Sequence, residues 1–118
     1  MKALIIFNRE PYDSTDVTWN GLRLAGKLRE AGQEVRIFLM NDSVDMAREV
    51  CKPPENYDQD LSRMLKELIA RGVPVKVCGT CMARCGIYKN HPYFDGAEKA
   101  AMSDLAQWVI DSDKVLTF

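Results

Sequence analysis

Three of the four cysteines in this chain lie close together, in the segment Cys78-Gly-Thr-Cys81-Met-Ala-Arg-Cys85. Thiolates are nucleophiles and metal ligands, and two nearby thiols can also form a reversible disulfide. The cluster is therefore compatible with three kinds of chemistry: a redox dithiol, a metal centre, or a nucleophile that carries sulfur as a persulfide. The apolar run at residues 73–77 comes directly before it and predicts a buried strand that ends at Cys78.

Cys78 and Cys81 form a C-x2-C pair, a spacing often used by redox dithiols. In thioredoxin-type proteins, however, the pair opens a long helix. Here Gly86 follows Cys81 after only four residues, and we expect residues 78–87 to form a loop. The spacing alone does not choose between a dithiol oxidoreductase and a sulfur carrier.

A metal centre would use Cys78, Cys81 and Cys85, with Cys51 or His91 as a fourth ligand. Zinc is usually held by two well-separated pairs of ligands, and a compact C-x2-C-x3-C segment lacks the second pair. The spacing also differs from those of the common iron–sulfur proteins. We therefore predict no metal, and the metal-binding protein remains an alternative.

Cys78 is the stronger candidate for a nucleophile because it follows the strand directly. A free thiol with a pKa near 8.5 is only about 3% thiolate at neutral pH, and lowering that pKa by about 1.5 units would make about half of it thiolate. The backbone N–H groups around Gly79 and Thr80 could favour the anion, and Arg84 could help them.

The elements that must position this cluster alternate between strand and helix. Apolar or mostly apolar segments predict strands at residues 3–7, 35–40, 73–77 and 114–118. Helical spacing of apolar residues predicts helices at residues 17–31, 44–51, 57–71 and 96–111. This alternation predicts an α/β fold, a mostly parallel sheet with helices on both faces. Ligands of such folds bind beyond the carboxyl ends of the strands, where loops 8–16, 40–43 and 78–87 should meet.

Other side chains near these loops give weaker signals. Tyr12, with Arg9 and Asp13, lies on the first loop and could line a pocket. His91 could be a general base, although a single loop histidine is more often a surface residue. Cys51 lies on an expected helix and is most simply a small core residue.

The 118 residues suit one domain, 1–118, and the net charge of −1 gives no reason to expect nucleic acid or an anionic membrane as a partner. No apolar run reaches the roughly 20 residues of a membrane-spanning helix. With no signal-peptide pattern at the start, we expect a cytoplasmic protein with reduced thiols. There is no G-x-G-x-x-G or G-x-x-x-x-G-K-[ST] motif, and no cofactor is predicted.

The chain resembles the DsrE/DsrF family of sulfur-relay proteins, and within it the YchN-like branch, almost from end to end. The resemblance includes Cys78, Thr80-Cys81 and Gly86-Ile87 at the cluster, and Asn8, Pro11 and Tyr12 before it. Its most specific part is the C-terminal region, with Leu105-Ala-Gln-Trp108 and Asp113-Lys-Val-Leu-Thr-Phe118.

This resemblance implies a three-layer α/β/α fold related to flavodoxin, assembled as a homotrimer or homohexamer. It also implies that Cys78 accepts sulfane sulfur from a donor protein as a persulfide and passes it to an acceptor protein, which would make the chain a sulfurtransferase. Cys81 matches a second cysteine of the YchN-like branch. Cys85 stands where the family pattern has a basic residue, so a third thiol could take part. An oligomeric binding protein with incidental cysteines remains a further alternative.

Overall fold

A five-stranded sheet forms the centre of the computed structural model, which describes residues 1–118. Its strands are β1 (Lys2–Phe7), β2 (Glu34–Leu39), β3 (Val75–Cys78), β4 (Ala97–Ala100) and β5 (Lys114–Thr117). They lie in the order β4-β3-β2-β1-β5, and every neighbouring pair is parallel. The predicted α/β class with a parallel sheet is confirmed.

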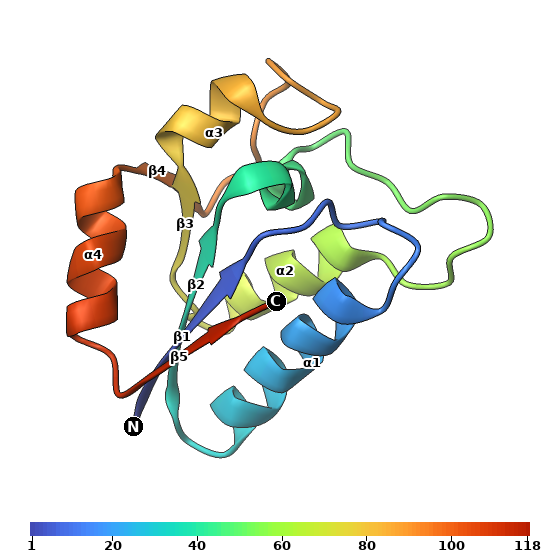
Figure 1. Cartoon of the computed structure of the whole chain (residues 1–118). Helices are drawn as coiled ribbons and strands as arrows, with labels where there is room; N and C mark the ends of the chain where they lie inside the picture. The colour runs from blue at the N-terminus through green and yellow to red at the C-terminus, as the bar shows by residue number, and fades with distance from the viewer.

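The order of the strands explains the layers. The chain steps in one direction from β1 through β2 and β3 to β4, and then returns to place β5 beside β1. Because such crossovers are right-handed, a reversal of direction moves the connecting helix to the opposite face of the sheet. Helices α1 (Val17–Glu30) and α2 (Leu61–Ala70) cover one face, and α4 (Met102–Ile110) covers the other (Figure 1).

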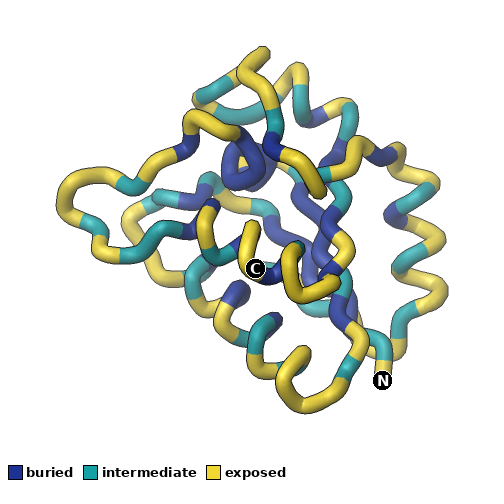
Figure 2. The backbone as a smooth tube through the Cα atoms, turned by 180° about the vertical axis from the view of Figure 1, so that it is seen from behind, coloured by how far each residue is buried: buried dark blue, intermediate teal, exposed yellow.

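The core lies on both faces of the central strands, against α1 and α2 on one side and against α4 on the other (Figure 1). Leu4, Ile5, Ile37 and Leu39 are fully buried in one continuous apolar cluster. In Figure 2 this buried path runs through the middle of the molecule, while the outer turns of the helices are exposed. Burial on this scale is the main force that holds the strand ends, and therefore the cysteines, in place.

Three predicted segments differ from the structure near the site. Residues 78–87 were expected to form a loop, but Gly79–Arg84 is a short helix, α3, that begins directly after Cys78. The helix expected at 44–51 is a 3₁₀ helix, η1, over Asn41–Ala47. Helix α2 begins four residues later than expected, because Asp60 caps it by accepting a hydrogen bond from the Arg63 N–H at 3.1 Å.

The largest correction concerns residues 96–111, which were predicted to be one helix. Residues Ala97–Ala100 instead form strand β4, and the helix starts only at Met102. Alanine, glutamate and lysine favour helices, so the local sequence gives no strand signal. Pairing with β3 overrides that preference and places Ala100 beside Cys78. No helix of the structure has the length and apolar character needed to cross a membrane.

Candidate functional site

The loops that follow β1, β2 and β3 meet at one edge of the sheet, as predicted. The Asn41 side chain donates a hydrogen bond from Nδ2 to Asn8 Oδ1 at 3.2 Å. The Asn41 backbone N–H donates to Cys81 Sγ at 3.2 Å. A continuous chain of contacts therefore joins the first two loops to the cysteine cluster.

Cys78 is the last residue of β3 and also the N-cap residue of α3. Its thiol is free and its residue is 5% exposed, in contact with the apolar core. No side chain caps the start of α3. The position at the strand end agrees with the sequence prediction, but the residue is buried, and a visiting thiol would need a local movement to reach the sulfur.

Cys81 lies one helical turn further on and faces the same interior. The pKa of its thiol is raised from an ordinary 9.0 to about 11, first by burial and then by a hydrogen bond to the Cys78 sulfur. The Asn41 N–H works in the opposite direction and lowers this pKa. At neutral pH Cys81 is therefore a neutral thiol.

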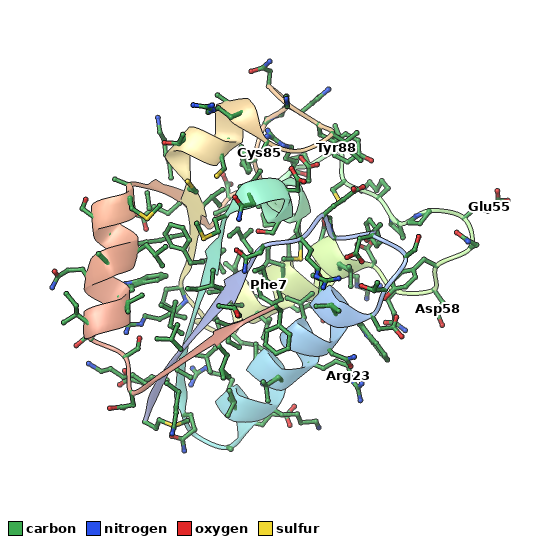
Figure 3. All side chains as sticks on the ribbon, in the orientation of Figure 1. Phe7, Arg23, Glu55, Asp58, Cys85 and Tyr88 are labelled. Carbon is green, nitrogen blue, oxygen red and sulfur yellow. The ribbon has the colours of Figure 1, made fainter.

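Cys85 ends α3 and is half-buried, so it is the most accessible of the three clustered thiols. Figure 3 shows it beneath the end of α3, near Tyr88 of the following loop. Arg84, the proposed helper of Cys78, lies at the far end of the six-residue helix from Cys78. Its side chain is exposed and forms no hydrogen bond or ion pair within the chain.

Lys99 is a cation near Cys78 that the sequence reasoning did not identify. On β4 it pairs with Val77, and its side chain crosses Gly79: a Cβ added to Gly79 would lie 2.9 Å from Lys99 Cε. Two open cavities, of about 540 and 390 Å³, both include Gly79 and Lys99 in their walls. Thr80 lines the larger one. The nearest open space to Cys78 is therefore beside the next residue of the chain.

A buried ion pair fixes the loop that follows the cysteines. Asp45 of η1 and Arg48, the residue that directly follows η1, are both about 1% exposed in their side chains, with Arg48 Nε donating to Asp45 Oδ1 at 2.8 Å. Arg48 also donates to the carbonyl oxygens of Met82 and His91, each at 2.8 Å. Asp45 in turn accepts from the Ile87 N–H at 2.6 Å. This pair links η1 to both sides of the loop.

Gly86 fits this arrangement because it lacks a side chain. Its φ is +91°, and a Cβ there would collide with the Asp45 carboxylate. Its N–H donates to Asp42 Oδ1 at 2.9 Å. Glycine is therefore required where the backbone passes closely over the buried carboxylate.

Comparison with known proteins places this geometry in a family. The DsrE/DsrF-like family matches the chain over residues 1–118. The chain belongs to the DsrE/DsrF-like family. Protein YchN of Escherichia coli is 43% identical over 119 residues, which cover 99% of this chain and 98% of YchN. An uncharacterized protein of Methanocaldococcus jannaschii is 37% identical over 120 residues, covering all of both chains.

A solved member of the DsrE/DsrF-like family has the same fold. The crystal structure of the YchN protein from Escherichia coli matches with a TM-score of 0.86 and 42% identity, over 100% of this chain and 99% of that one. The resemblance stated from the sequence is confirmed. Membership of this family implies a role related to sulfur relay.

Tyr12, a predicted site residue, lies away from the cysteine cluster. Tyr12 lines a different cavity of about 380 Å³, together with Cys51. Cys51 is 1% exposed, and burial raises the pKa of its thiol to about 11. His91 lies closer to the cluster, on the wall of the 390 Å³ cavity, but its ring is exposed and forms no hydrogen bond.

Tyr12 has a structural task that can be tested. Its hydroxyl oxygen accepts a hydrogen bond from the Leu61 N–H at 2.9 Å, at the start of α2. In a Tyr12→Phe variant this N–H loses its partner, and we expect the free energy of unfolding to fall by about 1 kcal/mol. Urea denaturation measures the change. An unchanged midpoint and slope would show that solvent replaces the hydroxyl without cost.

The candidate metal ligands do not converge. No group of three or more His, Cys, Asp or Glu side chains is arranged to hold a metal ion. Cys51 lines the cavity of Tyr12, and His91 lines the cavity beside α3. The metal-binding alternative therefore has no geometric support within this chain.

Proposed function

We propose that this protein is a sulfur carrier in which Cys78 holds sulfane sulfur as a persulfide and passes it to an acceptor protein. The observation that carries the proposal is the position of Cys78: a free thiol at the end of β3 and directly before α3, in a chain of the DsrE/DsrF-like family. All four cysteines are free, which suits work in the reducing cytoplasm.

In the first step the Cys78 thiolate attacks the terminal sulfur of a donor persulfide. A bond forms between this sulfur and Cys78, the donor's S–S bond breaks, and the donor leaves as a thiolate. In the second step an acceptor thiolate attacks the same sulfur and Cys78 leaves as a thiolate. Sulfur moves without net oxidation, so the reaction needs no redox cofactor.

The neighbours of Cys78 would have different roles in stabilising its thiolate. Cys81 stays protonated at neutral pH and stabilises the Cys78 thiolate through its S–H donor. Lys99 is better placed than Arg84 to supply positive charge, because it crosses Gly79 whereas Arg84 lies at the opposite end of α3. The flexible Lys99 side chain could also move to admit a donor.

A dithiol–disulfide oxidoreductase is the second candidate. The helix α3 that begins directly after Cys78 favours it, since redox C-x2-C pairs commonly open a helix. Cys81 lies one turn along α3 from Cys78, so the two thiols are close in the fold. In that case Cys81 would attack the Cys78 sulfur of a mixed disulfide or persulfide, and a Cys78–Cys81 disulfide would form as the partner thiolate or hydrosulfide leaves.

Intact-mass measurement separates the two candidates. The reduced protein is incubated with inorganic polysulfide, and wild type is compared with Cys78→Ser, Cys81→Ser and the control Cys51→Ser. A sulfur carrier gains sulfur in the wild type, Cys81→Ser and Cys51→Ser but not in Cys78→Ser. A loss of two hydrogens that requires both Cys78 and Cys81 would instead establish the oxidoreductase.

We also propose that the protein assembles as a homotrimer or homohexamer. Three apolar residues of α4 are exposed in the single chain: Met102 at 58%, Val109 at 40% and Ile110 at 75%. A second copy of the chain could cover this face of α4, which no other element of the fold covers. Donor and acceptor proteins would then dock at the cysteine edge of the sheet.

A further inference from the structure

The hydroxyl of Tyr93 is buried and has no hydrogen-bond partner. Only one other buried side-chain oxygen or nitrogen shares this property, Oγ1 of Thr18 on α1. Leaving a buried donor unpaired costs free energy, so such groups call for a specific explanation. A partner that is present only in another state of the protein would provide one.

Tyr93 lies beside the cysteine helix. It forms an isolated antiparallel bridge with Arg48, whose guanidinium carbon is 4.4 Å from the centroid of the Tyr93 ring. Its side chain lines the 390 Å³ cavity together with Gly79 and Met82, the residues that directly follow Cys78 and Cys81. Tyr93 and the residues that follow the two cysteines are therefore walls of the same cavity.

The charges and burial around Tyr93 decide the protonation of its hydroxyl. Burial raises the pKa of its hydroxyl to about 12, the Arg48 charge lowers it, and the Asp45 carboxylate, followed by smaller contributions from Cys81 and Cys78, raises it again. The phenol therefore remains a protonated donor at neutral pH. The nearby guanidinium makes it a stronger hydrogen-bond donor.

We propose that the Tyr93 hydroxyl donates a hydrogen bond to the terminal sulfur of the Cys78 persulfide. This inference rests on the proposed function and names the group that would stabilise the Cys78 persulfide, the intermediate of that function. Adding one sulfur extends the Cys78 side chain by about 2 Å and moves the negative charge outwards. A hydrogen bond to a charged acceptor is stronger than one between neutral groups, so the unpaired phenol gains most in the loaded state.

A Tyr93→Phe variant tests the assignment. We expect the polysulfide concentration that gives half-maximal persulfide to rise about tenfold, the equivalent of one charge-assisted hydrogen bond. Because the hydroxyl stabilises the anion, the pH profile of sulfur transfer to a small thiol should also shift upwards by about one unit. Loading is followed by intact mass, and transfer by the loss of the added sulfur.

The stability of the reduced protein provides the second measurement. Tyr93→Phe removes an unpaired hydroxyl, so its free energy of unfolding should equal or exceed that of the wild type. The matched control is Tyr88→Phe, which lies in the same loop but lines the cavity of Cys51 and forms no hydrogen bond through its hydroxyl. It should leave both loading and stability unchanged.

Three outcomes would overturn the assignment, and they are distinguishable. Equal loading and equal pH profiles in wild type and Tyr93→Phe would show that the phenol does not contact the persulfide. A lower free energy of unfolding in Tyr93→Phe would show that the hydroxyl already has a partner in the reduced protein. If the wild type takes up no sulfur at Cys78, the proposed function itself fails and this assignment fails with it.

Discussion

Replacing Arg48 by Met is expected to lower the free energy of unfolding by about 3–5 kcal/mol. Arg48 is buried and donates to Asp45, to the Met82 carbonyl and to the His91 carbonyl. Methionine fills similar space but leaves a buried carboxylate and two carbonyl groups without their donor. Since domains of this size are stable by only about 5–15 kcal/mol, the loss would be a large part of the total.

Urea denaturation measures this loss, and the chain provides a matched control. Arg63→Met makes the same substitution in an exposed ion pair with Glu67, whose two side chains are 76% and 61% exposed. Exposed pairs contribute about 0–1 kcal/mol, so this variant should stay close to the wild type. If Arg48→Met also stayed within 1 kcal/mol of the wild type, the buried pair would not be the anchor of the cysteine loop.

The same variant should expose the cysteine loop. Arg48 joins Met82 of α3 to His91, and Asp45 holds the Ile87 N–H between them. Without the pair, the segment around Cys85 loses its fixed contacts, and we expect Cys85 to react faster with a thiol reagent under conditions in which the variant is still folded. Arg63→Met should not change this rate.

Alkylation of Cys81 by iodoacetamide is expected to become about 100-fold faster between pH 8 and pH 10, because its thiolate fraction grows from about 0.1% to about 10%. These fractions follow from a pKa of about 11. A thiol with the ordinary value of 9.0 would change only about tenfold over the same interval. Because both alkylation rates are measured at Cys81, the steric protection of the buried sulfur cancels in the ratio of the two rates.

Site-resolved mass spectrometry of the labelled protein gives both rates, with circular dichroism to show that the chain is folded at both pH values. The control is the chain unfolded in guanidinium chloride, in which Cys81 should follow the ordinary tenfold change. In Cys78→Ala the increase should be smaller than in the wild type, because one cause of the raised pKa is removed. An equal increase in the folded and unfolded chains would contradict the protonated role of Cys81.

The unpaired phenol and the buried ion pair give the site two different kinds of support. Asp45 and Arg48 fix the backbone around the cysteines, and their loss should appear first as instability. Tyr93 contributes no partnered hydrogen bond to the reduced protein, and its loss should appear only in sulfur chemistry. Measuring stability and loading on the same variants therefore separates positioning from direct contact with the reacting sulfur.

The sequence was sufficient to predict the parallel sheet and the place of Cys78. Residues 3–7 are a continuous apolar run and residues 35–40 are apolar except for Arg36, and such runs are typical of strands covered on both faces. Their alternation with amphipathic helices leaves few topologies, and each of them puts the carboxyl ends of the strands at one edge. The meeting of Asn8, Asn41 and Cys81 follows from that rule.

Only the tertiary structure decided which residues surround the cysteines. Ala97–Ala100 has helix-forming residues and becomes a strand through pairing with β3, which brings Lys99 across Gly79. Arg48 and Tyr93 are far apart in the chain and meet through the isolated bridge between them. Apolar periodicity is a local property that sets the elements, whereas these contacts depend on long-range packing and leave no local pattern to detect.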